Sequence, residues 1–191
     1  MRGREKFKKI KLIINIIAKF YSLFPKKVQN RMFIKLRKKT GSFAMLKRYC
    51  IIKNLAKNIG DNVSIHPDVY IYNIQNLSIG DNVSIHPMTY IEACGYVEIG
   101  NDVSIAEGVT IMSVNHQFSN LEIPIKDQPV LCGKITIEDN VWLGAKSTIL
   151  YGRTIKKGSI VGANCLVTKD VQENEIVGGV PNRLIKKRTD N

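Results

Sequence analysis

From residue 59 onward, aliphatic side chains recur every six positions along the chain. This spacing fits neither the 3.6-residue period of an amphipathic helix nor the two-residue period of a half-buried strand. It fits a column of short strands that turns a corner every six residues, with three strands in a coil of about 18 residues. The aliphatic positions are Ile59, Ile65, Ile71, Ile79, Ile85, Ile91, Ile99, Ile105, Ile111, Ile137, Leu143, Ile149, Ile155, Val161 and Val167. The pattern predicts that each of them stacks on its counterpart in the next coil.

An internal duplication supports this prediction. The nine residues I-G-D-N-V-S-I-H-P at 59–67 recur unchanged at 79–87. Val63 and Val83 follow their aliphatic residues by four positions, where a narrow interior corner requires a small or β-branched side chain. Repeats of this kind are typical of solenoids, in which each coil is stabilised by its neighbours.

The residues before the repeat follow a helical pattern instead. Apolar residues between Ile10 and Phe24 recur with i, i+3, i+4, i+7 spacing. Pro25 ends this helix or begins the next, and Gly41 marks a further stop. We therefore expect three helices, over about 10–24, 28–36 and 43–55. The expected division of the chain is a basic amphipathic helical segment at 1–57 and a β-helix domain at 58–191.

The net charge of +13 is concentrated in the first segment, where 18 lysines and arginines face the single acid Glu5. Two interpretations stay open and are compatible: a helical cap on the end of the column with a solvated basic face, and peripheral contact with anionic lipid through residues 1–57. Lys11 and Lys19 interrupt the apolar run and no cleavage site follows it, so we predict neither a signal peptide nor a transmembrane helix. The expected location is the cytoplasm, with the inner face of the membrane as the alternative.

The four cysteines form no C-x-x-C pair and no closely spaced framework. Neither a zinc site nor a disulfide scaffold is indicated. We expect reduced thiols that behave as small buried hydrophobic side chains.

The six-residue pattern stops at Ile111 and resumes at Ile137. We expect a long loop at 112–134, and such excursions from compact repeat domains are usually functional. His116 is the one histidine in this loop, whereas His66 and His86 share the same phase of the duplicated nonapeptide. The shared phase indicates a shared structural role for those two.

The stretch from 59 to 188 resembles the hexapeptide-repeat acyltransferase family, and within it the bacterial sugar O-acetyltransferases. The resemblance rests on the repeat, on V-T-K-D at 167–170 and on G-V-P-N-R-L-I at 179–185. It implies an all-β fold, a left-handed parallel β-helix, here with an N-terminal α-helical appendage and a long active-site loop. The hand comes from the resemblance alone, since the periodicity carries no information about it. The basic N-terminal helices are similar to those of capsule and lipopolysaccharide O-acetyltransferases.

The same resemblance implies an activity, the transfer of acetyl from acetyl-CoA to a sugar hydroxyl, with His116 of the Asn115-His116 motif as the general base. An imidazole is suited to this step because a sugar hydroxyl is a poor nucleophile until its proton is removed. Transfer is direct in a ternary complex and requires no metal. Glu122 and Asp127 are candidates to orient the imidazole, or are solvated loop charges.

The resemblance also implies a site for the acyl donor in the C-terminal coils. Small residues 18 positions apart would stack into a shallow strip for the pantetheine arm, and basic residues near the C-terminus would meet the nucleotide phosphates. The alternative for the basic residues is a solvated tail. The implied donor-binding residues are Trp142, Gly144, Ala145, Gly162, Ala163, Thr168, Lys169, Arg183 and Lys186.

Two positions depart from the family pattern. Galactoside and maltose acetyltransferases have an acceptor-contacting Asn where this chain has His86, so His86 either lines a different acceptor pocket with Asn115 or has the structural role of His66. Arg153 falls on an interior corner, where an unpaired charge is costly to bury. We expect its side chain to turn outward or to meet a carboxylate.

The main prediction is O-acetylation of a bacterial surface polysaccharide or its precursor by a homotrimer, the assembly that the resemblance implies. The alternatives are N-acetylation of an amino sugar, transfer to a small saccharide, a zinc carbonic anhydrase and a non-catalytic binding module. The histidine spacings of 20 and 30 do not fit the carbonic anhydrase ligands. No nucleic-acid recognition motif accompanies the basic helices.

Overall fold

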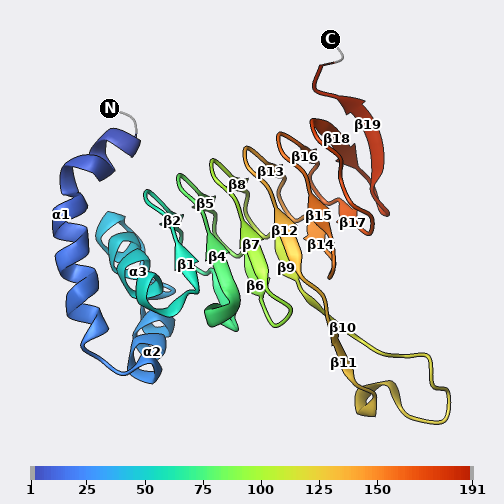
Figure 1. The fold of residues 1–191 in the computed structure, drawn as a ribbon, viewed down its shortest axis with the longest axis horizontal. Helices are drawn as coiled ribbons and strands as arrows, with labels where there is room; N and C mark the ends of the chain where they lie inside the picture. Colours follow the sequence, from blue (N-terminus) through green and yellow to red (C-terminus); the bar gives the residue numbers. More distant parts are fainter. Residues whose placement is uncertain (1–2, 190–191) are drawn as a thin grey trace.

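The computed structural model describes residues 3–189 and begins with three helices at one end of the molecule (Figure 1). They are α1 (Gly3–Ser22), α2 (Lys26–Leu36) and α3 (Ser42–Leu55). Pro25 precedes α2 directly, and Gly41 precedes α3 with a left-handed φ of 90°. The three predicted helices are therefore present, although α1 begins seven residues before Ile10. The ends of both expected segments, residues 1–2 and 190–191, lie outside the described residues.

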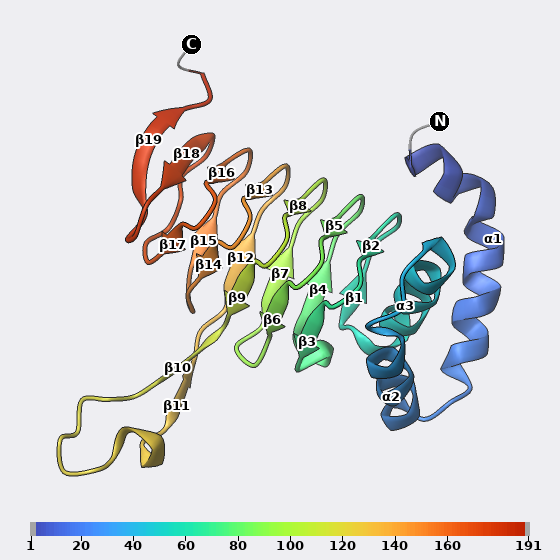
Figure 2. The same ribbon diagram turned by 180° about the vertical axis from the view of Figure 1, so that it is seen from behind.

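Helix α3 lies between the other two helices and the first coil of the β-structure (Figures 1 and 2). Its side chains Ile51, Ile52 and Leu55 are buried in the same core as the coils. Helix α1 contributes Ile14 and Ala18 to this core. The helices therefore cover the end of the β-structure, where stacked strands would otherwise expose apolar side chains. None of the described helices has the length and apolarity that a membrane crossing needs.

Arg48 of α3 links the helices to the first coil through hydrogen bonds to the backbone. Its side chain is 1% exposed. The guanidinium donates to the carbonyl oxygens of Ile65 at 2.8 Å, Leu36 at 3.0 Å and Lys39 at 2.7 Å. Burial lowers the pKa of Arg48, and the charge of Asp68 opposes this shift. The buried charge is stabilised by three backbone carbonyls, one at the last residue of α2 and one in the turn that follows it.

The β-structure is a column of three parallel sheets, and its successive coils lie side by side along the long axis in Figure 1. We call them sheets A, B and C. Sheet A contains β1 (Asn58–Ile59), β4 (Leu77–Ile79), β7 (Val97–Ile99), β12 (Ile135–Ile137) and β15 (Thr154–Ile155). Sheet B contains β2 (Ser64–Ile65), β5 (Ser84–Ile85), β8 (Ser104–Ile105), β13 (Trp142–Leu143), β16 (Ile160–Val161), β18 (Glu175–Gly178) and the antiparallel β19 (Arg183–Lys187). Sheet C contains β3 (Tyr70–Tyr72), β6 (Tyr90–Glu92), β9 (Thr110–Met112), β14 (Thr148–Ile149) and β17 (Leu166–Val167).

The aliphatic residues stack inside this column as the six-residue period predicts. In sheet B, Ile85, Ile105, Leu143 and Val161 are consecutive partners in the parallel ladders, and all four are fully buried. Each coil visits sheets A, B and C in turn. The predicted parallel β-helix with N-terminal helices is therefore confirmed.

The duplicated G-D-N sequence forms the corner between sheets A and B. The backbone N–H of Asp61 donates to the carboxylate of Asp81 at 2.6 Å, and the N–H of Asp81 donates to the side chain of Asn101 at 2.8 Å. A Cβ at Gly60 would lie 2.3 Å from the Asp81 carboxylate, so a side chain does not fit there. Asn62 has a φ of 56°, in the left-handed region that Asn tolerates. The sequence identity of the two repeats therefore reflects a side-chain ladder along this corner.

The excursion at 112–134 is more ordered than the loop that we expected. Strands β10 (Val114–His116) and β11 (Val130–Cys132) pair in antiparallel register, and a 3-10 turn, η2 (Ile125–Asp127), lies near the tip. The hairpin projects away from the column in both views (Figures 1 and 2). We call residues 114–132 the arm. A second 3-10 turn, η1 (Ile74–Asn76), occupies the same corner of the first coil.

Candidate active site

His116 ends the first strand of the arm. It pairs with Val130 across the hairpin, and its side chain is exposed. The backbone N–H of His116 donates to the side-chain oxygen of Asn115 at 3.0 Å. The arm leaves the column at the corner between β9 of sheet C and β12 of sheet A. The structure therefore presents the imidazole on a projecting element, away from the core of its own chain.

Gln128 organises the tip of the arm, a role that the sequence analysis did not predict. The residue is 5% exposed. Its amide nitrogen donates to the carbonyl oxygens of Asn120 at 2.7 Å and Ile123 at 2.8 Å, and its amide oxygen accepts from the N–H of Asn120 at 3.2 Å. A glutamine in a polar loop looks like a solvated residue until the turn around it is known.

Neither candidate carboxylate contacts the imidazole. Asp127 accepts a hydrogen bond from Lys126 at 2.6 Å, and the N–H of Glu122 donates to the side chain of Asn120 at 2.9 Å. Within residues 3–189, no hydrogen bond joins the His116 ring to either group. The solvated-charge alternative fits both residues in the single chain.

The corner between sheets B and C carries the small residues that the sequence singled out. The parallel register stacks the residues after the sheet B strands in one line: His66, His86, Ala106, Gly144 and Gly162. The residues that follow them include Ala145, which is half-buried, and Ala163, which is exposed. We call the line formed by residues 144–145 and 162–163 the small-residue strip.

Close packing between coils explains one of these glycines. A Cβ at Gly144 would lie 2.6 Å from the backbone nitrogen of Ala163. A side chain there does not fit, with or without a bound ligand. Gly144 is buried, so the accessible part of the strip consists of Ala145, Gly162 and Ala163. Trp142 is 52% exposed beside it on the outer surface of sheet B, between Ser104 and Ile160.

His66 and His86 form a ring stack at the opposite end of the same corner. Their ring centroids lie 4.8 Å apart with an interplanar angle of 11°. Burial lowers the pKa of His66, and the neighbouring His86 and Arg48 charges lower it further. The shared structural role indicated by their shared phase agrees with this stack. His86 is also next to Ala106 along the line that leads to the small-residue strip.

Asn182 joins the two C-terminal motifs, a role that the sequence analysis missed. Its side-chain oxygen accepts hydrogen bonds from the backbone N–H groups of Thr168 at 3.0 Å and Lys169 at 3.2 Å. Arg183 follows directly and pairs with Gly178, whereas Lys186 pairs with Ile176 further along β19. Thr168, Lys169 and Arg183 are thus brought to one end of the column, with Lys186 on the adjoining hairpin.

His116 and the small-residue strip occupy different corners of the column. The strip lies between sheets B and C, whereas the arm departs between sheets C and A. One face of the column, sheet C, separates them. A single chain therefore does not bring the candidate base to the candidate donor strip.

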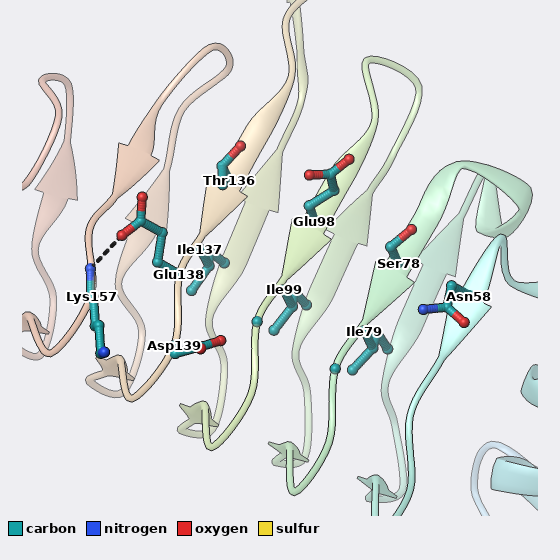
Figure 3. A pocket seen from close by; sticks show the side chains of 12 residues that line it. Asn58, Ser78, Ile79, Glu98, Ile99, Thr136, Ile137, Glu138, Asp139 and Lys157 are labelled. Carbon is teal, nitrogen blue, oxygen red and sulfur yellow. Dashed lines mark hydrogen bonds between the residues drawn. The ribbon is translucent and has the colours of Figure 1, made fainter.

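Two grooves occur elsewhere on the molecule. One, of about 420 Å³, lies on the outer face of sheet A, where Figure 3 shows polar side chains such as Ser78, Glu98 and Thr136 in a row. The second, of about 440 Å³, lies between α1, α3 and the first two coils. Neither groove includes His116 or the small-residue strip. Within residues 3–189, no group of three or more His, Cys, Asp or Glu side chains is placed to hold a metal ion.

The expectation about the cysteines needs correction, and the two alternatives for Arg153 can be distinguished. Cys50 and Cys165 are buried as expected, but Cys132 is exposed and Cys94 is half-buried. The sequence does not show that these two approach each other at the base of the arm. Arg153 meets no carboxylate within the described residues: its side chain is only half-buried, consistent with the outward alternative, and donates to the carbonyl oxygen of Tyr151 at 3.2 Å.

Comparison with known proteins agrees with this architecture. The model of the "hexapeptide repeat of succinyl-transferase" family matches residues 134–169. Galactoside O-acetyltransferase of Escherichia coli K12 is 35% identical over 144 residues, which cover 75% of this chain and 70% of the relative. A protein of the same organism assigned to lipopolysaccharide biosynthesis O-acetyl transfer, WbbJ, is 36% identical over 90 residues, which cover 44% and 46% of the two chains.

Solved structures show the same fold. A hexapeptide-repeat acetyltransferase of Vibrio cholerae, complexed with acetyl-CoA, superposes with a TM-score of 0.75 at 24% identity and covers 86% of this chain and 87% of its own. A galactoside acetyltransferase in complex with coenzyme A gives a TM-score of 0.65 at 27% identity, with coverage of 86% and 82%.

The hexapeptide-repeat match and the similarity to named acetyltransferases define the class of this protein as an acyltransferase. The identity to galactoside O-acetyltransferase extends over more than two thirds of both chains. The chain therefore belongs to the hexapeptide-repeat acetyltransferase family.

Proposed function

We propose that this protein transfers an acetyl group from acetyl-CoA to a sugar hydroxyl of a bacterial surface polysaccharide or its precursor, with His116 as the general base. The exposed position of His116 on the arm carries the proposal, because it leaves the imidazole accessible to an acceptor. The similarity to a galactoside O-acetyltransferase and to WbbJ supports a sugar acceptor.

In this mechanism, His116 removes the proton of the acceptor hydroxyl as its oxygen attacks the thioester carbonyl. The carbon–sulfur bond then breaks, the thiolate of CoA leaves, and the proton on the imidazole passes to that sulfur. General-base catalysis of this kind contributes about 10²–10⁴ in rate. Asn115, whose side chain accepts the His116 N–H, and His86 are the proposed acceptor contacts.

The small-residue strip is the proposed binding site of the acyl donor, acetyl-CoA. The small side chains of Ala145, Gly162 and Ala163 leave room for an extended pantetheine arm, and Gly144 lets the coils beneath it pack closely. Trp142 offers an exposed apolar surface beside them. Thr168, Lys169, Arg183 and Lys186 would bind the phosphates at the end of the column. Lysine and arginine donors are suited to phosphate oxygens.

We propose a homotrimer in which the arm of one copy supplies His116 to the small-residue strip of its neighbour. Two observations support this: the strip and the arm lie on different corners of the column, and the arm exposes apolar side chains. Phe118 is 64% exposed and Leu121 is 93% exposed. Apolar residues in such positions mark a surface that another molecule covers.

Substitution of the base provides the first test. We expect His116→Ala to lower kcat by about 10²–10⁴ while the affinity for CoA stays within about twofold, because the ring touches the acceptor and not the donor strip. Gln117→Ala is the matched control, since it truncates the neighbouring side chain of the arm and leaves the imidazole in place, and it retains activity. Unchanged turnover in His116→Ala would remove His116 from the mechanism.

Mixing two inactive variants tests the shared site. His116→Ala removes the base, and Ala163→Trp fills the strip. If each site combines two chains, co-refolded or co-expressed mixtures regain activity, because some sites hold an intact arm beside an intact strip. Equal inactivity of the mixture, with trimers verified by sedimentation, contradicts the proposal.

A second candidate is N-acylation of an amino sugar. A solved N-acyltransferase of Bacillus cereus, in complex with dTDP and 3-hydroxybutyryl-CoA, is 27% identical with a TM-score of 0.60. The same base and strip serve an amine as well as a hydroxyl. Release of the CoA thiol with neutral saccharides, compared with amino-sugar nucleotides, separates the two: preference for the amine selects N-acylation.

We also propose that α1 holds the enzyme at the inner face of the membrane. The outward surface of α1 carries apolar side chains, with Leu12 74%, Ile16 61% and Phe20 56% exposed, in a segment of high positive charge. This combination is typical of helices that lie in a bilayer interface. The full-length protein should sediment with vesicles that contain anionic lipid, and a Leu12→Ser/Ile16→Ser variant should not. Absence of sedimentation at low and physiological salt refutes the idea.

A further inference from the structure

The base of the arm brings together two cysteines that lie 38 residues apart in the chain. Cys94 lies in the turn after β6, and Cys132 ends β11. Their Sγ atoms are 2.8 Å apart. That separation is shorter than the roughly 3.5–4.0 Å at which non-bonded heavy atoms usually rest. The two thiols are therefore within reach of a covalent bond without rearrangement of the fold.

The backbone around these cysteines fixes their approach independently of the sulfur atoms. The side chain of Ser113 accepts the N–H of Gly95 at 2.8 Å, and its carbonyl oxygen accepts the N–H of Gly133 at 2.9 Å. A Cβ at Gly95 would lie 2.6 Å from the nitrogen of Gly133. The residues directly after both cysteines are thus held against each other by one buried serine.

Cys94 is also held from its own coil. Its N–H donates to the carboxylate of Glu92 at 3.0 Å, and its carbonyl oxygen accepts from the side chain of Asn76 at 3.2 Å. A disulfide requires a narrow range of separations and directions between the two Cβ atoms. Cys94 is held by contacts in its own coil, and Cys132 is held by its pairing with Val114 across the hairpin. The backbone therefore leaves both cysteines little freedom to move.

This pair differs from the other two cysteines of the chain. Cys50 and Cys165 are buried, and burial raises the pKa of Cys50 to about 11. Cys132 is exposed and Cys94 is half-buried, so small oxidants have access to the pair. The hydrogen bond with Cys94 raises the pKa of Cys132, so exchange is slower at neutral pH than for an ordinary thiol and accelerates as the pH rises.

The position of the pair relates it to the proposed catalytic base. Cys132 is the hairpin partner of Val114, two residues from His116. A bond from Cys132 to Cys94 would attach the returning strand of the arm to the preceding coil of the column. The arm is otherwise tied to the column at this point by the main chain, the Ser113 contacts and the ion pair of Lys134 with Glu98.

We propose that Cys94 and Cys132 form a reversible disulfide that clamps the arm to the column and so responds to the thiol redox state of the cell. With a low-molecular-weight disulfide such as oxidised glutathione, one protein thiolate attacks a glutathione sulfur and releases one glutathione thiolate. The second protein thiol, after losing its proton, displaces the other glutathione. One S–S bond forms in the protein, and the two electrons reduce glutathione disulfide to two thiols.

The chemical test is peptide mapping of the full-length protein after incubation with oxidised glutathione, followed by alkylation of the remaining thiols. We expect a cross-linked pair of peptides that contain Cys94 and Cys132, with Cys50 and Cys165 alkylated after unfolding. Cys94→Ser and Cys132→Ser are matched variants that lose the cross-link. Separate alkylation of both cysteines, or stable glutathione adducts on each, overturns the proposal.

The structural test is hydrogen exchange of residues 114–132 in the oxidised and the reduced protein. Cross-linking should slow exchange at the base of the arm by at least about tenfold, because it removes opened states. Cys94→Ser, treated with the same oxidant, should show no change. A disulfide that forms without slower exchange overturns the clamp.

The catalytic consequence rests on the proposed function. We expect the rate of CoA release to differ at least about threefold between the oxidised and the reduced enzyme, and to be restored by dithiothreitol, since the clamp constrains the element that carries the base. The same difference in Cys94→Ser would assign the effect to another group and overturn the regulatory role. Mapping and exchange need no activity, so their outcome is independent of the acetyltransferase proposal.

Discussion

The column and the arm are built on opposite principles. In the column, side chains such as Ile105 and Leu143 are fully buried between aliphatic neighbours of the adjacent coils, and the coils repeat the same pattern. In the arm, Leu121 is 93% exposed, and order depends on a three-residue strand pair and one buried glutamine. The column therefore carries the stability of the fold, whereas the arm carries the candidate base and, in the proposed trimer, is covered by a neighbouring copy.

The largest difference between the two regions should appear in equilibrium stability. Ile105→Ala creates a cavity in the centre of a stacked row and should lower the free energy of unfolding by about 2–5 kcal/mol. Leu121→Ala in the arm should change it by less than about 0.5 kcal/mol in the single chain. Urea denaturation followed by circular dichroism measures both. Equal losses would show that the arm contributes to the core.

A smaller and local effect is expected inside the arm. Gln128→Leu leaves the N–H and carbonyl of Asn120 and the carbonyl of Ile123 without their partner, at a cost of about 1–3 kcal/mol for buried groups. Hydrogen exchange should accelerate in residues 117–129 while the column remains protected, and turnover should fall because the arm is less ordered. Gln117→Ala, whose side chain contacts Ser119, is the control. Loss of protection in the column would contradict the separation of the two regions.

The smallest effect concerns the junction between the two regions. Lys134, just after the arm, forms an ion pair with Glu98 of β7 at 2.7 Å, and both side chains are about half exposed. Lys134→Met should cost less than about 1 kcal/mol, and the difference from wild type should shrink in high salt. Lys157→Met is a matched substitution outside this ion pair. A cost above about 2 kcal/mol would show that the junction is structurally essential.

The positions that repeat were predictable from the sequence, and those that occur once were not. The stacked aliphatic residues and the narrow corners follow from the six-residue period, because each depends on the neighbouring coil only. The antiparallel pairing of Val114 with Cys132 has no repeat and no turn signal to reveal it. The roles of Gln128 and Asn182 were not predicted for the same reason, because their hydrogen bonds join segments that share no sequence pattern.

The candidate site was predictable as a set of residues but not as an arrangement. His116 was identified by its place in the interruption and by family resemblance, and Gly144 and Gly162 by their spacing of 18. Which corner each would occupy depends on the number of residues in every preceding turn. The separation of the arm from the small-residue strip, on which the proposed trimer rests, therefore emerged only from the folded chain.

The sequence by itself determined the column, because the six-residue pattern specifies the contacts between adjacent coils and the same contacts recur in every coil. It also determined the three helices, through their apolar periodicity and their Pro and Gly boundaries. The tertiary structure decided the burial of Arg48 against three carbonyls, the stacking of His66 on His86 and the meeting of Cys94 with Cys132. These contacts join residues 9 to 38 positions apart, so they depend on how the whole chain is wound and not on the properties of any one segment.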